Sequence, residues 1–175
     1  MPRTSMSAIE RTVVQPSEGE YVDFGSLGVA WKIEGTETAG CFAVVEHPIP
    51  PRSLAAPLHF HHNEDEYSYV LEGTLGAMLG DQVVTATPGS WLLKPRGEWH
   101  TFWNPGHSLC RVVEIISPSG FEHYFREVAE VFEVADGGLP NLERFAAVND
   151  RYELEMDFDS IPDLCRRFGL THPMA

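Results

Sequence analysis

Short segments of alternating apolar and polar residues, separated by glycine and proline, run from Tyr21 to about Ile116. A period of two is typical of strands that bury one face, and glycine and proline mark the turns between them. Many short strands at close spacing indicate an antiparallel sandwich or barrel. The pattern predicts strands at residues 29–34, 41–47, 66–72, 74–80, 82–87, 91–94, 101–103 and 109–116.

After Ile116 the apolar period becomes helical, and one predicted helix face carries Phe121, Phe125, Val128 and Phe132. Ser117 can cap this helix, with Pro118 in its first position. Shorter helices are predicted at 142–148 and 162–168. We interpret the phenylalanine stripe as packing against the outside of the sheet rather than as a ligand site.

The length of 175 residues is enough for one domain with a substantial core. We divide it into a loose N-terminal segment (1–20), a β-barrel (21–117) and a helical extension of the same domain (118–175). Residues 12–14 could form an edge strand. The fold class predicted is therefore mainly β, an antiparallel barrel with C-terminal helices packed outside it.

Charge and the remaining composition exclude several classes of partner. A formal net charge of −14 argues against nucleic acid and anionic membranes, because phosphate binding needs a basic surface. No apolar run approaches the length of a membrane span, and the N-terminus lacks the apolar core of a secretory signal. The three cysteines form no CxxC pair, so we expect reduced thiols in a cytoplasmic protein, with Cys41 and Cys110 in the core.

Two stretches, PLHFHHNEDEYSYVLEG and GSWLLKPRGEWHTFWN, carry the candidate chemistry. His59 and His61 are two residues apart, so on a strand both imidazoles point to the same face. Glu66 follows in the first stretch, and His100 lies in the second. Three histidines and one carboxylate are a plausible complete ligand set for a first-row transition metal.

Other polar residues near the first stretch are given ordinary structural interpretations. The same alternation places His62 on the opposite face, so we expect it at the surface. Glu64 and Asp65 are interpreted as solvated turn charges. Histidines outside the two stretches are interpreted as structural, namely His47, His107, His123 and His172.

The two stretches resemble the paired signature of the cupin superfamily. The first pattern is G, five residues, H-x-H, three or four residues, E, six residues, G, and this chain departs from it only in having Ser53 at the leading glycine. The positions that match the two patterns are His59, His61, Glu66 and Gly73, then Gly89, Pro95, Gly97, His100 and Asn104. The resemblance implies a small jelly-roll barrel with one divalent metal inside, held by His59, His61, Glu66 and His100.

Strand alternation also predicts what surrounds the metal. Ser68 and Val70 share the inward face with Glu66, and Phe102 shares it with His100, as a pocket wall or as ordinary core. Such a site leaves one or two metal positions open, which suits bidentate oxygen donors such as enediols, flavonols or β-diketones, with or without O₂. Glu66 is then a ligand, a base, or both.

The segment PSGFEHYF resembles the helical extension of bacterial single-domain cupins of the quercetin-dioxygenase-like group. This resemblance implies a metal-dependent dioxygenase acting on a small enolisable aromatic or diketone substrate. Two alternatives stay open: a metal-dependent isomerase, lyase or decarboxylase, and a non-catalytic small-molecule-binding cupin. The metal could be Fe, Mn, Ni, Co or Zn, and a homodimer paired through sheet edges, with residues 12–14 crossing over, is expected.

Overall fold

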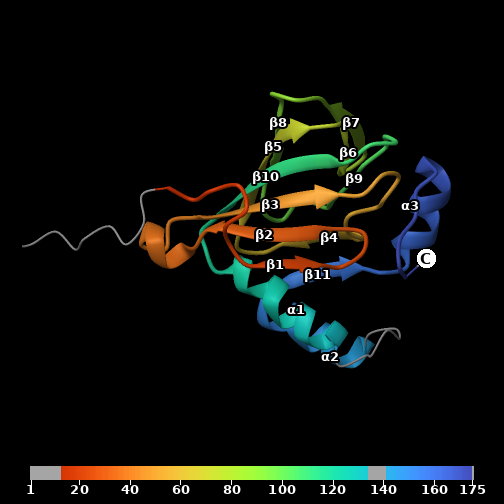
Figure 1. The fold of residues 1–175 in the computed structure, drawn as a ribbon. Coiled ribbons are helices and arrows are strands. Elements are labelled where there is room, and N and C mark those ends of the chain that lie inside the picture. The colour runs from red at the N-terminus through yellow and green to blue at the C-terminus, as the bar shows by residue number, and fades with distance from the viewer. Residues whose placement is uncertain (1–12, 134–140, 175) are drawn as a thin grey trace, which may run out of the picture.

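The computed structural model describes residues 13–133 and 141–174, in which two antiparallel sheets face each other (Figure 1). The six-stranded sheet has the order β1 (Tyr21–Asp23), β2 (Gly28–Ile33), β3 (Ala43–Ile49), β10 (Cys110–Ser117), β5 (Asp65–Glu72) and β8 (Trp91–Lys94). The five-stranded sheet has the order β11 (Leu154–Asp157), β4 (Leu58–His61), β9 (His100–Trp103), β6 (Leu75–Leu79) and β7 (Gln82–Ala86). This mainly β, jelly-roll arrangement confirms the predicted fold class.

Strand β11 is an element that the alternation did not predict. It pairs with β4, with Leu154 opposite His61 and Met156 opposite His59. The C-terminal part of the chain therefore adds an edge strand to the sheet that carries both histidines, besides its helices. A strand of four residues gives too short a periodic signal to be recognised, and its pairing with β4 is a tertiary contact.

The helices are η1 (Gly35–Thr38), η2 (Phe121–His123), α1 (Tyr124–Glu133), α2 (Leu142–Arg151) and α3 (Ser160–Phe168). In Figure 1, α1 and α2 lie together beside one end of the sandwich, and α3 lies apart from them. The helical segment after β10 begins at Phe121 behind Gly120, so the prediction of a start at Ser117 was wrong. Ser117 is the last residue of β10 and pairs with Asp65, which continues the sheet past the predicted cap.

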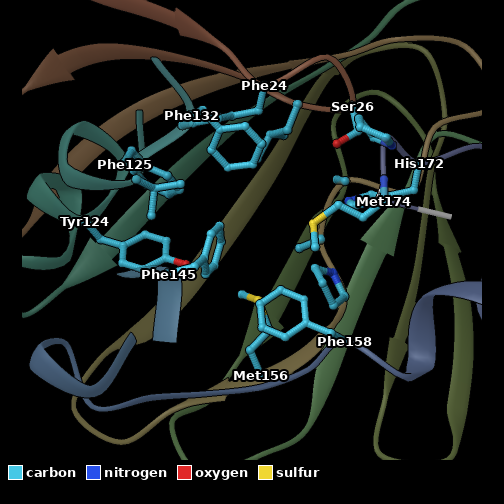
Figure 2. A pocket seen from close by; sticks show the side chains of 16 residues that line it. Phe24, Ser26, Tyr124, Phe125, Phe132, Phe145, Met156, Phe158, His172 and Met174 are labelled. Carbon is cyan, nitrogen blue, oxygen red and sulfur yellow. Dashed lines mark hydrogen bonds between the residues drawn. The ribbon is translucent and has the colours of Figure 1, made fainter. Parts of the chain in front are cut away.

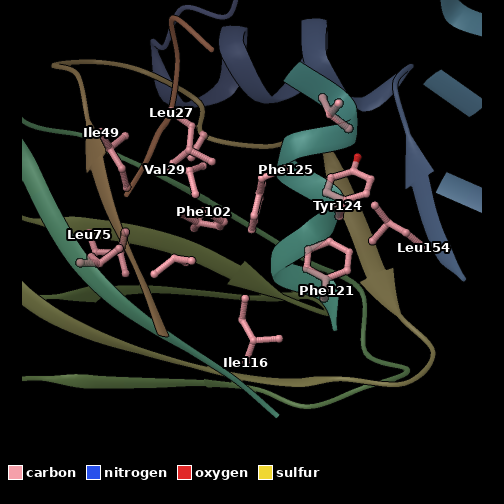
Figure 3. Close-up of a cluster of buried hydrophobic side chains, with 14 of the residues drawn as sticks. Leu27, Val29, Ile49, Leu75, Phe102, Ile116, Phe121, Tyr124, Phe125 and Leu154 are labelled. Carbon is pink, nitrogen blue, oxygen red and sulfur yellow. The ribbon is translucent and has the colours of Figure 1, made fainter. Parts of the chain in front are cut away.

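The phenylalanine stripe lies at the opening between the two sheets. The prediction that it packs against the outside of a sheet was wrong. Phe121 packs on His61 with ring centroids 4.3 Å apart, and Phe125 packs on His47 at 5.5 Å. Figure 3 shows Phe121, Tyr124 and Phe125 directed toward the buried side chains of the strands. These contacts place η2 and α1 across the mouth of the barrel rather than over an outer sheet face.

The cysteines are all free thiols, and Cys110 is buried as predicted. Cys41 is exposed, which contradicts its predicted place in the core, because it lies in the turn before β3 rather than in the strand. Val13 and Val14 lie outside any strand, and Thr12 is not among the described residues. None of the helices found in 13–133 and 141–174 is both long and apolar enough to cross a membrane.

Candidate metal centre

The candidate centre draws its side chains from both sheets. His59 and His61 come from β4, and His100 from β9 lies directly opposite His59 in the antiparallel register. Glu66 comes from β5 in the other sheet. All four side chains are buried, and one ligand atom from each lies within 4.8 Å of the others. The structure thus brings together the four residues that the spacing and the resemblance single out.

Local backbone contacts orient two of the imidazoles. His59 Nδ1 donates to the carbonyl of Pro57 at 2.8 Å, and His100 Nδ1 donates to the carbonyl of Glu98 at 2.9 Å. A carbonyl can only accept, so each Nδ1 carries the proton and each Nε2 presents its lone pair. A hydrogen bond of this kind fixes the ring orientation of most metal-binding histidines.

Several buried nitrogens in the group have no hydrogen-bond partner among the described residues. These atoms are Nε2 of His100 and both ring nitrogens of His61. Buried polar atoms are nearly always satisfied, so unpaired atoms require an explanation such as a bound ion. Nitrogen lone pairs around one carboxylate are the donors that a divalent first-row metal prefers, and the residues present therefore fit such an ion.

The surroundings favour the neutral form of two of the imidazoles, those of His59 and His100. Burial, followed by repulsion from His100 and His61, holds the pKa of His59 well below its usual range. Burial also lowers the pKa of His100, although Glu66 opposes the shift. Neutral imidazole is the form that binds a metal, so the folded chain presents these ligands without first having to remove protons at neutral pH.

A buried ion network reaches the centre from the six-stranded sheet. Lys94 Nζ lies 2.7 Å from Glu66 Oε2 and 2.8 Å from Glu114 Oε2. Ser68 Oγ donates to the same oxygen of Glu114 at 2.7 Å. Lys94 is only 1% exposed. The metal-facing carboxylate is therefore tied to a lysine and, through it, to a second carboxylate.

Contacts within the network shift the pKa values of its three ionisable groups. Burial would lower the pKa of Lys94, but Glu114 and Glu66 together raise it above its ordinary value. Burial would raise the pKa of Glu66, but Lys94 and the neighbouring imidazoles bring it well below its usual range. For Glu114 burial dominates and raises the pKa to about 7. An ammonium and an ionised Glu66 thus face each other inside the protein.

Lys94 and Glu114 were not among the site residues predicted from the sequence. A signal was present, because β8 alternates exposed and buried residues, which places Lys94 on the same inward face as Leu92. A lysine on an apolar inward face is rare unless it is paired. Its partner on β10 is distant in sequence, so no local pattern connects the two.

Three polar residues next to the ligands of the first motif, His62, Glu64 and Asp65, differ in their exposure and in their partners. His62 is exposed and lies 3.6 Å from Glu155, as its position on the outward face predicted. Glu64 is only 7% exposed, with Oε2 3.7 Å from His61 Nδ1, so its prediction as a solvated charge was wrong. Asp65 begins β5 and forms an ion pair with Arg96 at 2.8 Å. The turn folds Glu64 back under the imidazole, which strand alternation does not describe.

A second group of possible ligands, Glu34, Glu122 and His123, is satisfied by protein contacts. Glu122 accepts hydrogen bonds from the backbone N–H groups of Gly35 and Gly120. Glu34 forms an ion pair with Arg126. These carboxylates anchor η2 to the loop after β2, and we assign them no ligand role.

The candidate centre opens into a cavity of about 50 Å³ between the sheets. Phe102 lines it, as the alternation allowed, together with Lys94 and Glu114. Ser68 and Val70 are fully buried but are not among the lining residues. Ser68 is engaged with Glu114, and Val70 belongs to the hydrophobic core.

A second cavity of about 100 Å³ adjoins the first and is almost entirely apolar (Figure 2). Its walls come from the strand ends, from α1 and α2, and from the C-terminal tail, and they carry Phe24, Phe125, Phe132, Phe145, Phe158, Met156 and Met174. The residues common to both cavities are Leu27, Ala56, Tyr124, Phe125 and Met156. The cavity at the polar centre therefore lies directly beside an aromatic chamber, with shared wall residues between them.

Comparison with known proteins finds a match to one protein family and several solved structures with a similar fold. Residues 46–116 match the family described as the cupin domain, and no curated protein matches the chain. Among solved structures, KdgF from Halomonas sp. has 15% identity and a TM-score of 0.56, over 64% of this chain and 97% of that one.

Two further structures are similar at comparable coverage. A predicted oxalate decarboxylase from Thermotoga maritima has 23% identity and a TM-score of 0.56, over 61% of this chain and 99% of that one. The polyketide cyclase RemF from Streptomyces resistomycificus has 23% identity and a TM-score of 0.54, over 66% of this chain and 93% of that one. At such identities the likeness shows a common fold, and the chemistry must be argued from the site.

Proposed function

The chain belongs to the cupin superfamily, and we propose that it is a metal-dependent oxygenase, of dioxygenase type, acting on a small enolisable aromatic or diketone substrate. One observation carries the proposal: within a buried group of three histidines and one glutamate, His59, His61 and Glu66 line a cavity that lies beside an aromatic chamber. The polar centre suits the oxygen atoms of a substrate, and the aromatic chamber suits its ring.

One divalent metal per chain would be held by His59, His61, His100 and Glu66. Such an ion acts as a Lewis acid that polarises an oxygen donor and makes its proton or an adjacent C–H more acidic. The mixed nitrogen and oxygen donor set is compatible with Fe, Mn, Ni, Co or Zn.

The chain's own residues supply the proton transfer and the binding. Glu66 is ionised because its pKa lies well below the usual range, so Oε1 would serve as a metal ligand and, on leaving the metal, could accept a proton from the enol. Its other oxygen, Oε2, is engaged by Lys94. Phe125 and Tyr124 line both this polar end and the larger apolar space and would contact an apolar part of the substrate.

Cavity size restricts the proposed substrate. An apolar cavity of about 150 Å³ is known to bind benzene. The two adjoining cavities, of about 50 and 100 Å³, are together no larger than that cavity, so they favour a small diketone or enol with at most one ring. We expect a one-ring diketone to be a better substrate than a three-ring flavonol.

The test is O₂ consumption by protein loaded separately with each candidate metal. Candidate substrates are 1-phenylbutane-1,3-dione and a flavonol, and the matched control is the His59→Ala/His100→Ala double variant. Metal-dependent O₂ uptake with loss of the diketone absorbance, absent in the variant, supports the oxygenase. Background uptake with every metal contradicts it, and binding of the diketone without turnover points to a non-catalytic cupin.

A metal-dependent isomerase or lyase is the second candidate, favoured by the additional acid–base groups in the cavity. Glu114 lines the cavity with a pKa raised to about 7, which suits a group that both takes and gives a proton near neutrality. Such an enzyme would need no O₂. Anaerobic conversion of an enolisable substrate by the metal-loaded protein would therefore replace the oxygenase with this candidate.

We further propose a cytoplasmic homodimer formed through sheet edges. Strand β8 is at an edge of the six-stranded sheet, and its outward residues Trp91 and Leu93 are 53% and 59% exposed. Unpaired edge strands with exposed apolar side chains favour association. Light scattering at micromolar concentration should give the mass of two chains, and a Trp91→Glu/Leu93→Glu variant should give the mass of one. A wild-type monomer would refute the dimer.

A further inference from the structure

We propose that Lys94 is a positioning residue that withholds one oxygen of Glu66 from the metal and thereby keeps two coordination positions free for a chelating substrate. The inference rests on the proposed function, because it requires a metal at the three histidines and a substrate with two oxygen donors. It concerns a residue that belongs to neither of the two motif patterns.

Both oxygens of Glu66 lie close to imidazole nitrogens. Oε1 is 3.6 Å from His61 Nε2, and Oε2 is 3.6 Å from His100 Nε2. The position of the carboxylate alone would therefore allow it to bind an ion through either oxygen or through both. Lys94 Nζ, at 2.7 Å from Oε2, removes one of these choices and leaves Oε1 as the available donor.

The lysine is held in place by three neighbouring strands. In the register of the six-stranded sheet, Lys94 on β8 is opposite Glu66 on β5, and Ser68 on β5 is opposite Glu114 on β10. Glu114 accepts hydrogen bonds from both Lys94 and Ser68, and the ring of Phe102 lies 4.6 Å from Nζ. A fully buried lysine is tolerated only when it is paired in this way.

The arrangement has a consequence for metal binding. A six-coordinate ion with three histidines and one oxygen of Glu66 keeps two positions for other donors. With both oxygens bound it would keep one, which is too few for a chelating substrate. The ammonium also repels a cation, so Lys94 weakens metal binding while it preserves the open positions.

The test uses Lys94→Met, which keeps the length of the side chain and removes its charge. Cobalt(II) is the metal probe, with affinity measured by competition against a chromophoric chelator, and acetohydroxamic acid is the two-oxygen probe. We expect the variant to bind cobalt on the order of tenfold more tightly or more. We also expect its cobalt form to bind acetohydroxamic acid about tenfold more weakly than the wild type does. A change in the visible spectrum of cobalt reports the coordination directly.

Leu92→Met is the matched control, because Leu92 is buried on the same face of β8. It should change neither affinity. If Lys94→Met does not fold, as judged by circular dichroism, the uncharged Lys94→Gln variant tests the same two expectations. In a Glu66→Gln background, the lysine substitution should no longer weaken binding of the two-oxygen probe.

The outcomes separate this inference from the proposed function. If the wild type binds cobalt and Lys94→Met binds it equally or more weakly, the proposed role of Lys94 is wrong. The proposed metal site is then still supported. Tighter cobalt binding with unaltered acetohydroxamic acid binding also overturns it, because Lys94 would then act through charge alone. A wild type that binds no cobalt overturns both.

Discussion

The two sheets contribute opposite chemistry to the same cavity. The five-stranded sheet supplies His59, His61 and His100, and carbonyls near in sequence orient two of these rings, His59 and His100, whose pKa values are lowered by burial. The six-stranded sheet supplies Glu66, Lys94 and Glu114. The charged groups are paired across three strands, β8, β5 and β10. The histidines come from two strands, β4 and β9. We expect loss of Glu114 from the charged side to affect mainly stability, and loss of the histidines to affect mainly metal binding.

Replacement of two histidines should give the largest effect on the centre. His59→Ala/His100→Ala removes two of the four donor groups and should reduce bound metal from near one equivalent to background. Metal content by mass spectrometry, on protein made without a His-tag, checks this. A double variant that retains its metal would show that the ion binds elsewhere.

Removal of the second carboxylate should affect the fold more than the metal. Glu114→Ala leaves the buried ammonium of Lys94 with one partner instead of two. Breaking a buried ion pair on one side destabilises a protein by about 3–5 kcal/mol. Urea denaturation of metal-free protein measures the difference. A loss below about 1 kcal/mol would contradict the view that the charged side is structural.

Acid should destabilise the protein through His47. Burial, opposed by a hydrogen bond from Nδ1 to Gly28, lowers the pKa of His47 to about 4. Its pKa is thus lower in the folded than in the unfolded chain, where about 6.5 is usual, so the unfolded chain binds more protons. This contribution to stability is complete above about pH 6.5 and is lost as the pH falls toward 4, by at most about 3 kcal/mol.

The His47→Gln variant isolates that contribution. Its unfolding free energy should fall less than that of the wild type between pH 6.5 and pH 4.5, as measured by urea denaturation at each pH. Equal slopes for the two proteins would assign the acid sensitivity to other groups.

A substitution on the outward face should have the smallest effect. His62 directly follows the ligand His61 in sequence but is exposed, and its side chain lies 3.6 Å from Glu155. Exposed pairs contribute little, so His62→Ala should change stability by less than about 0.5 kcal/mol. Metal content should be that of the wild type. Loss of metal in this variant would refute the assignment of faces along β4.

Strand alternation and motif spacing were sufficient to predict most of the sheets and the four candidate ligands. Alternation is a local property of the backbone, and it places His59 and His61 on one face and His62 on the other in any strand. The same rule is consistent with the buried position of Lys94 on β8, but the sequence motifs gave no reason to single it out. The outward expectation for Glu64 failed because a turn, unlike a strand, follows no fixed period.

The sequence by itself determined where the chain alternates, which residues could hold a metal, and that the chain is acidic. Only the tertiary structure decided that β11 pairs with β4, that η2 and α1 cross the barrel mouth, and that Lys94 joins Glu66 to Glu114. The physical reason is separation along the chain. Strand periodicity is encoded by neighbouring residues, whereas a buried charge network and a shared cavity need groups that only folding brings together.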